Sequence, residues 1–532
     1  MAESKENVLM EKIVSLCKRR GFIYQSSEIY GGINGFWDYG PLGAELKRNV
    51  KELWWNTMTR QRDDVVGLEA TIIMSPLIWK ASGHVDTFTD PMIDCKTCKG
   101  RFRADQTNEI PCPQKPSKMV SECHGEKTPP RAFNLMFQTY VGPVQDDSAI
   151  AYLRPETAQA IFAQFKNVLE TSRQKVPFGI AQVGKAFRNE VTPRNFTFRS
   201  REFEQMELEF FIKPDEVVEA ITGRVASAAE IGNRESEIGN PDWGWKAWHK
   251  YWVEERIAFY ESIGLTRDTL VEYWQKPEEL AHYARACVDI LFKFPFGTQE
   301  LEGIAARSDF DLSQHERFSG KPMGVFDEEL RAAWSKLPKE KQDELWRRYY
   351  ENRRKYLVKM GVAEEQSAQD ATEDANGLAK GQYIPHVIEP SAGVDRLILA
   401  LIANAYSEDQ MPDEKGKLET RVVLKFHPRV APIKVAVLPL LKNKPELVQT
   451  AQAVRDLLRP WMNVYYDDAG AIGRRYRRQD EAGTPFCLTI DFGTLGEKPE
   501  LKDTVTVRYR DDGRQERLAI GELLNWLLPK IR

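Results

Sequence analysis

Apolar side chains recur along this chain at spacings that distinguish helices from strands. They repeat every three to four positions over residues 6–20, which predicts an amphipathic helix that ends at Gly21. A glycine-rich turn region at residues 29–43 then leads into a second long helix, which passes through Leu53 and Trp54.

Residues 177–212 alternate in a way that predicts two strands joined by a loop. The side chains predicted to share a face are those of Gln182, Gly184, Ala186, Arg188, Glu190, Arg201, Phe203, Gln205, Glu207 and Glu209. This face is polar with small gaps, whereas a half-buried strand ordinarily turns an apolar face inward. It therefore predicts the floor of a pocket, over which the basic loop at residues 191–199 could fold.

The stretch from Lys213 to Gln382 is predicted to be mostly helical. Its four tryptophans between residues 243 and 252 favour core packing over a stacking platform for bases. A strand is predicted at residues 299–305. A charged helical pair is predicted at residues 326–361, and a loose acidic linker follows at residues 363–381.

A short strand at residues 387–389 is predicted to meet a helix after Pro390. Ser391 stands where it could cap that helix, whose apolar stripe begins at Val394. Arg396 would then project from the first turns of the helix toward the end of the strand.

A polar hinge at residues 407–418 and a return strand near Val422 lead into a regular α/β unit. Strands are predicted at residues 434–438, 463–467, 486–490 and 504–509, and helices at residues 446–458 and 472–482. This alternation predicts a compact final domain of mixed α/β structure.

A length of 532 residues is too great for one core and predicts two to four domains. No apolar run approaches the roughly 20 residues that a membrane span needs, and the first residues are charged. We therefore expect a cytoplasmic protein with no membrane partner. The net charge is −4, but residues 431–532 carry 17 Lys and Arg against 14 Asp and Glu, so the end of the chain is its more basic part.

The seven cysteines do not predict a disulfide framework, because their number is odd and no secretory signal precedes them. Cys95, Cys98, Cys112 and Cys123 instead suit a tetrahedral zinc site, since two cysteines separated by two residues can reach one ion from a turn. His124 could replace Cys123 as the fourth ligand. The alternative is four reduced, partly buried thiols, which the unequal spacing also allows.

Arginines and carboxylates are concentrated in four short blocks, at residues 154–157, 187–190, 199–207 and 388–396. Arginines neutralise a polyphosphate and carboxylates hold an ammonium group, and both are required to join a nucleoside triphosphate to an amino acid. No general base is needed for this reaction, because the carboxylate of an amino acid is already ionised at neutral pH.

These blocks resemble the three signature motifs of class II aminoacyl-tRNA synthetases, and their sequences are similar to those of the homodimeric glycyl-tRNA synthetases. The resemblance implies a class II catalytic core over residues 1–425, an antiparallel β-sheet flanked by helices. This core would carry an irregular, possibly zinc-binding insertion at about 80–150 and a helical insertion at about 215–382. A mixed α/β anticodon-binding domain would follow at residues 426–532.

Residues 29–43 resemble the first motif of that family, which forms the dimer interface and ends in a proline, here Pro41. A homodimer is therefore expected. From spacing alone, a helix that packs only in the core of its own monomer is an equal alternative.

The resemblance also implies a role for single residues in binding ATP with Mg²⁺. Arg188 would bind the α-phosphate and the substrate carboxylate, Arg396 would bind the γ-phosphate, and Phe203 would stack on adenine. The nucleotide set is Arg188, Asn189, Glu190, Phe198, Arg199, Ser200, Arg201, Glu202, Phe203, Glu300, Leu301, Gly393, Val394, Asp395 and Arg396. Arg188 or Arg396 alone could be a surface residue in an ion pair. Because one arginine lies at a strand end and the other at a helix start, the two together favour a common site.

For glycine, the resemblance implies that Glu156, Glu207 and Ser391 accept hydrogen bonds from the amine, with Arg103 near the substrate carboxylate. The full set is Arg103, Glu156, Phe203, Glu204, Gln205, Met206, Glu207, Glu389, Pro390, Ser391, Ala392 and Gly393. Crowding would exclude larger amino acids, so no editing domain is expected. Glu156 follows Pro155 and could also serve a helix N-terminus.

In the final domain, Arg474, Arg475, Arg477 and Arg478 surround an aromatic residue. Arginine can pair with phosphate and stack on unpaired bases, so these four are candidates for contact with tRNA. A solvated basic helix face is the alternative.

The expected activity is ATP-dependent activation of glycine to glycyl-adenylate and transfer to the 3′ end of tRNA(Gly). One alternative is a nucleic-acid-binding accessory subunit, such as that of a mitochondrial DNA polymerase, which has lost catalysis; the presence of Arg188, Glu190 and Arg396 argues against it. Another is a tRNA-independent adenylating enzyme, which should lack the final domain.

Overall fold

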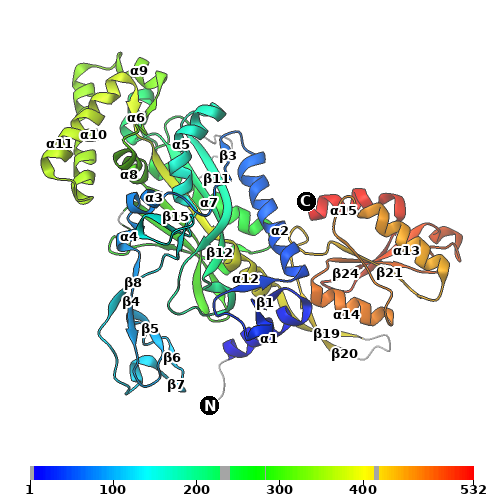
Figure 1. Cartoon of the computed structure of the whole chain (residues 1–532). Helices are drawn as coiled ribbons and strands as arrows, with labels where there is room; N and C mark the ends of the chain where they lie inside the picture. Colours follow the sequence, from blue (N-terminus) through cyan, green and yellow to red (C-terminus); the bar gives the residue numbers. More distant parts are fainter. Residues whose placement is uncertain (1–4, 228–229, 231–239, 282, 413–417) are drawn as a thin grey trace.

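The computed structural model describes residues 5–227, 230, 240–281, 283–412 and 418–532. A central body is built on a large sheet, and a small lobe of short strands, a group of three helices and the C-terminal domain project from it (Figure 1). Within the described ranges, every helix is too short or too polar to cross a membrane.

Seven strands form the central sheet, in the order β13-β14-β15-β18-β12-β11-β3. All neighbours are antiparallel except β11 and β3. The strands are β3 (Val65–Gly67), β11 (Phe178–Phe187), β12 (Glu202–Ile212), β13 (Leu270–Trp274), β14 (Ala284–Phe294), β15 (Gly297–Arg307) and β18 (His386–Gly393). The predicted antiparallel core and the predicted strand pair within residues 177–212 are confirmed.

The prediction that the region from Lys213 to Gln382 is mostly helical was wrong for β13 and β14. From Val288 to Phe294, β14 buries alternate side chains, but polar residues such as Asp289 obscure this period in the sequence. Pairing with β13 and β15 on both sides supplies the backbone hydrogen bonds that make the segment a strand.

One face of the sheet is apolar and carries the main core. Met206 and Phe210 of β12 lie in this core together with Trp248 and Trp252, so the predicted packing role of the tryptophans is confirmed. Burial of each such side chain contributes roughly 1.5–3 kcal/mol. The helices that contribute to this core are α1 (Lys5–Arg20), α2 (Pro41–Trp55), α7 (Trp245–Ser262) and α12 (Val394–Ala405).

The opposite face changes character along its length. At one end Phe178, Ile180 and Phe211 pack in a second apolar core. At the other end the strands present the polar residues that the alternation predicted, among them Gln182 and Glu207. The helices that contribute to this second core include α5 (Ala158–Ser172), α6 (Asp215–Thr222) and α8 (Phe310–Ser319). The switch from apolar to polar leaves space for a site at the second end.

The predicted charged helical pair is confirmed as α9 (Glu328–Trp334) and α10 (Lys339–Lys359). The loose linker predicted at residues 363–381 was wrong, because α11 (Glu364–Gly377) is a helix that packs against α10. Ser367, Ala371 and Ala375 recur every four residues and are fully buried. Small side chains on one face allow this close helix contact, which an acidic composition alone does not indicate.

The irregular region predicted at about residues 80–150 consists of two short helices and several short strands. They are α3 (Pro76–Ala81), α4 (His84–Thr87), β4 (Thr89–Asp94), β5 (Arg101–Arg103), β6 (Pro111–Cys112), β7 (Lys115–Met119), β8 (Arg131–Asn134), β9 (Gln138–Tyr140) and β10 (Ile150–Tyr152). Strands β4 to β8 form the small lobe in Figure 1.

A hairpin of β19 (Tyr406–Pro412) and β20 (Leu418–Leu424) precedes the final domain, so the predicted polar hinge was wrong for residues 407–412 and the return strand is confirmed. Residues 413–417 of that hinge lie outside the described ranges. The final sheet has the order β22-β21-β23-β24-β25. Its elements are β21 (Val435–Pro439), α13 (Pro445–Leu458), β22 (Val464–Tyr466), α14 (Ile472–Ala482), β23 (Phe486–Ile490), β24 (Thr504–Tyr509), β25 (Gln515–Ala519) and α15 (Leu523–Ile531). The six predicted elements are confirmed within two residues; β25 and α15 were not predicted.

Candidate active site

The register of the central strands brings the predicted polar residues onto one face. Gln182 of β11 lies opposite Glu207 of β12, and Glu207 lies opposite Ser391 of β18. Directly opposed residues of antiparallel strands point to the same side, so the three side chains share a face. Three strands distant in sequence therefore build one polar floor.

A cleft of about 160 Å³ opens beside this floor and has Ser391 in common with it, whereas Gln182 and Glu207 do not line it. It is lined by Arg188, Glu190, Thr197, Phe198, Arg199, Ser200, Phe203, Gln205, Glu300, Ser391, Gly393, Asp395 and Arg396. All but Thr197 were predicted as nucleotide or glycine residues. The cleft combines three arginines with aromatic rings, which suits an anionic ligand that carries a planar ring.

Arg188 is held at one part of the cleft by backbone and aromatic contacts. Its Nε donates to the carbonyl oxygen of Pro155 at 3.0 Å. The guanidinium carbon lies 5.4 Å from the ring centroid of Phe88 and 5.3 Å from that of Phe203. Because no carboxylate is among these contacts, the charge of Arg188 is available to a bound anion.

Arg396 stands in the first turn of α12. Its Nη1 lies 3.2 Å from Glu300 Oε2, and its guanidinium lies 4.6 Å from the ring centroid of Phe198. The side chain is 30% exposed, so a ligand can reach it. Glu300 lies on β15 at the rim of the cleft and offers a carboxylate oxygen of the kind that Mg²⁺ prefers.

The loop between β11 and β12 is fastened by two arginines. Arg199 Nε donates to Glu190 Oε2 at 2.8 Å, and both residues line the cleft. Arg201 turns away from it and donates to the carbonyl oxygens of Glu190 and Asn34. Arg201 therefore fixes the loop, whereas Arg199 is in position to face a ligand.

Asp395 anchors the start of α12. Its carboxylate accepts hydrogen bonds from Tyr39 Oη at 2.6 Å, Lys47 Nζ at 2.8 Å and the backbone N–H of Glu204 at 2.7 Å. These contacts tie α12 to α2 and β12. They orient Arg396, the next residue.

A group of buried carboxylates lies on the same floor. Glu156 Oε2 is 3.3 Å from His84 Nε2. Burial alone raises the pKa of Glu156, but the nearby His84, Arg307 and Arg188 outweigh it and hold the pKa below its ordinary value. Glu207 accepts a hydrogen bond from the hydroxyl of Thr157. Such anionic acceptors can hold a small cation.

Arg307 neutralises part of this acidic group. Its Nη1 lies 2.6 Å from Glu389 Oε1, and its Nη2 lies 2.8 Å from Asp311 Oδ2. The guanidinium also lies 3.8 Å from the ring centroid of Tyr283. Arg307 is only 3% exposed, so this ion pair is part of the interior.

The site sets predicted from sequence were too broad where every residue of a strand was included. Glu202 pairs with Lys185, and Glu204 pairs with Lys47 and Lys51 on the far face of β12. The side chains of Leu301, Val394, Met206 and Ala392 lie in the apolar core. Pro390 and Asn189 do not line the cleft either, and the backbone N–H of Asn189 donates to the carbonyl oxygen of Leu135. Alternation along each strand separates these residues from the pocket. Glu156, Glu207 and Glu389 were also predicted and also lie outside the lining of the cleft.

Two further details differ from the sequence analysis. Gly393, and not Ser391, is the N-cap residue of α12. Ser391 lies within β18, two residues before the end of that strand. Arg103 lies on β5 and pairs with Asp90 at 2.9 Å and Asp105 at 2.6 Å, away from the lining of the cleft.

Known families match both parts of this architecture. The family model "tRNA synthetase class II core domain (G, H, P, S and T)" matches residues 143–405, and "Anticodon binding domain" matches residues 434–530. A curated glycine–tRNA ligase of Treponema denticola is 44% identical over 525 residues, which cover 99% of this chain and 98% of the relative. The chain belongs to the glycine–tRNA ligase family. Ligases of Thermobifida fusca (43% over 541 residues, 98% of each chain) and Thermus thermophilus (43% over 566 residues, 98% of this chain and 99% of the relative) agree with this.

In this member of the family, the four predicted zinc ligands lie in the small lobe, but among the described residues no three of their sulfur atoms lie within 4.8 Å of one another. The Sγ atoms of Cys95 and Cys123 are 3.9 Å apart, close to the roughly 3.8 Å edge of a tetrahedron with 2.3 Å zinc–sulfur bonds. Backbone N–H groups of Cys98 and Thr97 point at the Cys95 sulfur and lower its pKa, which favours the thiolate. His124 is exposed, whereas Cys123 is partly buried.

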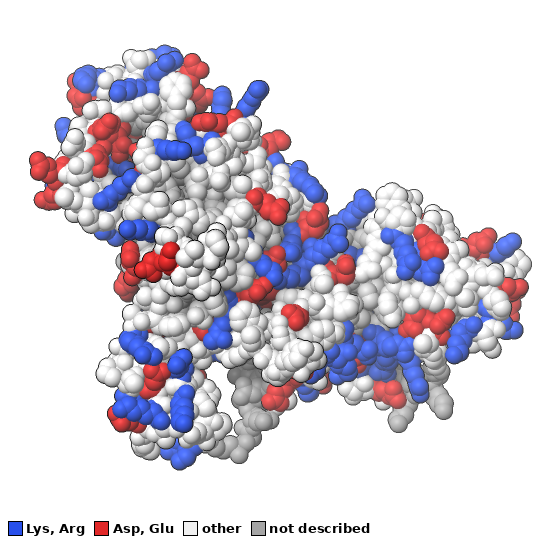
Figure 2. All heavy atoms as spheres, in the orientation of Figure 1, with Lys and Arg blue, Asp and Glu red and all other residues white. Residues whose placement is uncertain are grey.

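The arginines of α14 divide into two kinds. Figure 2 shows Lys and Arg side chains gathered over α14. Arg474 is exposed and Arg477 is 31% exposed. Arg475 is 1% exposed and donates to the carbonyl oxygens of Pro439 and Asp467, and Arg478 pairs with Asp467. Arg475 therefore packs the domain and is unavailable to tRNA.

Four residues near the acidic floor were not predicted as site residues: His84, Thr157, Glu209 and Arg307. Glu209 was identifiable, because it continues the alternation of the predicted pocket face. Arg307 follows a predicted strand, but no spacing signals its pairing with Glu389. His84 comes from a short helix outside the four blocks, so only the fold brings it to Glu156.

Proposed function

We propose that the chain activates glycine with ATP and transfers it to the 3′ end of tRNA(Gly). The observation that supports this proposal is a cleft lined by Arg188, Arg199 and Arg396 in which Ser391, one of the lining residues, lies opposite the buried Glu207. Family membership supports the catalytic reading over a non-catalytic accessory subunit. The presence of the final domain supports transfer to tRNA over a tRNA-independent adenylation.

The first step is an attack of the glycine carboxylate on the α-phosphorus of ATP, and repulsion between two anions is its main barrier. Arg188 would bind the α-phosphate and the attacking carboxylate, and Arg396 would bind the γ-phosphate. Arg199 faces the same cleft. Since these groups are preorganised, each can stabilise the charge that develops in the transition state by a few kcal/mol.

Mg²⁺ bound with ATP would supply further charge neutralisation, and Glu300 is the residue placed to hold it. The carboxylate of Glu300 reaches Arg396 and lines the cleft, so it lies where a nucleotide phosphate would meet Arg396. Phe203, whose ring forms part of the cleft, would pack against the adenine ring.

Glycine would bind on the acidic floor. Glu156, Glu207 and Ser391 would receive its amine, and the hydrogen bond of 3.3 Å that Gln205 Nε2 donates to Ser391 Oγ supports this role for Ser391. Larger amino acids would be excluded by the surrounding side chains, because a side chain at the α-carbon would have to displace buried groups. No smaller amino acid exists, so an editing step is not required.

The test is glycine-dependent exchange of labelled pyrophosphate into ATP. Arg396→Ala should lower the exchange rate by about 10²- to 10³-fold, as expected for the loss of one preorganised charge contact. Arg477→Ala, on the distant α14, is the matched control and should exchange at the wild-type rate, since exchange does not use tRNA. Exchange with alanine or serine equal to that with glycine would refute the assigned specificity.

We also propose that two chains form a homodimer through the segment before α2. Ile29 and Tyr30 are each 87% exposed and Ile33 is 52% exposed, an apolar patch that a second copy could cover. One face of α2 itself is buried in the core of its own chain, through Leu46 and Val50. Tyr30→Asp should shift the sedimentation coefficient toward that of a monomer.

A structural zinc ion held by Cys95, Cys98, Cys112 and Cys123 would complete the small lobe. The supporting observations are the close sulfur pair and the N–H groups directed at sulfur. Such an ion would stabilise a lobe whose own apolar cluster is small.

We place the enzyme in the cytoplasm, where its proposed tRNA substrate is used.

A further inference from the structure

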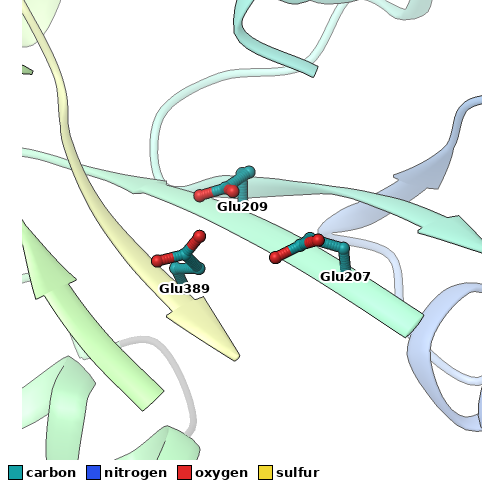
Figure 3. Close-up of side chains that lie close together, drawn as sticks. All are labelled: Glu207, Glu209 and Glu389. Atoms are coloured by element: carbon teal, nitrogen blue, oxygen red, sulfur yellow. The ribbon is translucent and has the colours of Figure 1, made fainter. Parts of the chain in front are cut away.

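Glu209 lies at the centre of the acidic floor, and the proposed mechanism leaves it without a task. One carboxylate oxygen from each of Glu207, Glu209 and Glu389 lies within 4.8 Å of the other two. Figure 3 shows the three side chains converging from two neighbouring strands, β12 and β18. The strand register passes from Glu207 opposite Ser391 to Phe210 opposite Ile388, so Glu209 lies directly across from Glu389.

Glu209 differs from its neighbours in having no partner. It is 0% exposed, and among the described residues neither of its carboxylate oxygens has a hydrogen-bond partner. Glu207 receives the hydroxyl of Thr157, and Glu389 receives Arg307. An ionised carboxylate with no donor is expensive to bury, whereas a protonated one costs far less.

The charged groups around Glu209 cannot supply a counterion. Among the described residues whose charges act most strongly on Glu209, the one cation is Arg307 on β15, which already pairs with Glu389 and with Asp311 on α8. Glu207 on the same strand and Glu389 on β18 add negative charge. Burial, followed by the charge of Glu389, raises the pKa of Glu209 well above its ordinary value.

We propose that Glu209 is a neutral carboxylic acid whose proton positions the Glu389 and Glu207 carboxylates for the amine of glycine. The proposal rests on the proposed glycine-binding role of this floor. The proton stays on Glu209, so no covalent step is involved. Glu209 is therefore a positioning residue and not a catalytic residue. Burial raises the pKa of Glu389 to about 8 and also raises the pKa of Glu207 above its ordinary value. A neutral Glu209 can donate an O–H to either neighbour after a small side-chain rotation or through one water, and such a hydrogen bond favours the ionised form of that neighbour, which the ammonium group requires.

Two substitutions at Glu209 separate a proton-bearing acid from an anion. Glu209→Gln keeps the shape and a donor group without a negative charge, so KM for glycine in the exchange reaction should stay within about twofold of wild type. Glu209→Met removes the donor and should raise KM for glycine about 10- to 100-fold, as expected for a lost hydrogen bond to a charged group. KM for ATP should not change in either variant.

The matched control is Glu207→Gln, two residues away on the same face of β12. Glu207 is proposed to act as an anion, so its Gln variant should raise KM for glycine more than tenfold. A Glu209→Gln enzyme impaired as strongly as Glu207→Gln would overturn the proposal, because Glu209 would then act as a negative charge. A Glu209→Met enzyme with unchanged KM for glycine would overturn it as well, because the side chain would then only fill space.

A spectroscopic measurement tests the proton without any activity. At pH 7 the infrared C=O band of protonated carboxylic acids should be present in the wild-type protein and weaker in Glu209→Gln by the contribution of one acid, while buried acids with raised pKa values such as Glu389 keep theirs. Glu126→Gln, at an exposed residue that pairs with Lys96, should leave the band unchanged. Equal bands in wild type and Glu209→Gln would show that Glu209 carries no proton and would refute the proposal. The same result is expected if the three carboxylates bind a divalent cation. Failure of glycine-dependent exchange in the wild type would instead refute the proposed function.

Discussion

Asp480 joins the C-terminal domain to the hairpin that precedes it, and its replacement tests how α14 is held. Asp480 lies on α14, is fully buried, and receives Arg421 of β20 at 3.0 Å and Arg508 of β24 at 2.8 Å. Arg421 and Arg508 are 2% and 5% exposed. Asp480→Asn keeps the size of the side chain and removes its charge, so the two guanidinium groups lose their common counterion.

The magnitude depends on which arginine has another partner. Removing one member of a buried ion pair costs about 3–5 kcal/mol. Arg421 also makes a bidentate pair with Asp409, through bonds of 2.6 and 2.9 Å, so it stays compensated. Arg508 is left mainly with the Met411 sulfur. We therefore expect the lower end, about 3 kcal/mol, which in a domain of this size lowers Tm by roughly 10–25 °C.

Calorimetry should show an earlier transition that belongs to the final domain, while the transition of the central body stays in place. Pyrophosphate exchange at 25 °C should be unaffected, but charging of tRNA should fall, because α14 carries the arginines proposed to meet it. Asp456→Asn is the control, at an exposed aspartate of α13 that pairs with Arg455, and should leave the calorimetric trace unchanged. A Tm for the final domain within about 2 °C of wild type would show that the buried pairs do not hold it.

Three further outcomes are expected. Zinc measured by elemental analysis should be about one equivalent per chain and close to zero in Cys95→Ser, and equal zinc in both proteins would exclude this site. Between pH 5 and 8 the wild-type protein should lose thermal stability as pH rises, because Glu209 has a raised pKa and keeps its proton in the folded state, whereas in the unfolded chain it loses the proton above the ordinary pKa of glutamate. Glu209→Gln should lose less stability over this range. Parallel curves of stability against pH for the two proteins would contradict the assignment. The double variant Arg474→Ala, Arg477→Ala should bind tRNA several-fold more weakly at unchanged Tm, whereas Arg475→Ala should lower Tm. A double variant with a lower Tm and unchanged tRNA binding would exclude α14 as a helix that faces RNA.

Sequence patterns predicted most of the elements that carry the cleft, because local alternation is strong there. On β11 and β12 the period of two is unbroken, and it separates Gln205 and Glu207 from Glu204 and Met206 before any fold is known. Strict use of this alternation on every strand excludes the predicted site residues that are only sequence neighbours of pocket residues. The error came from treating short blocks as units when only every second residue of a strand reaches the pocket.

The rest depended on contacts between distant segments. β14 is a strand because β13 and β15 flank it, and α11 is a helix in place of the predicted linker because α10 covers its small residues. His84 reaches Glu156 across 72 positions of sequence, and no local property of either residue predicts that meeting.

The two faces of the central sheet show how stability and the proposed chemistry are divided. Phe210 and its neighbours on one face bury apolar surface, and this stabilises the sheet without any ligand. On the other face, Glu207 and Glu389 lie near Arg307, and burial raises the pKa of both carboxyl groups, whereas His84, Arg307 and Arg188 lower the pKa of Glu156. Under the proposed function, the ammonium group of glycine would favour the ionised forms of Glu207 and Glu389. The apolar face would then supply the stability that offsets the cost of burying these charges.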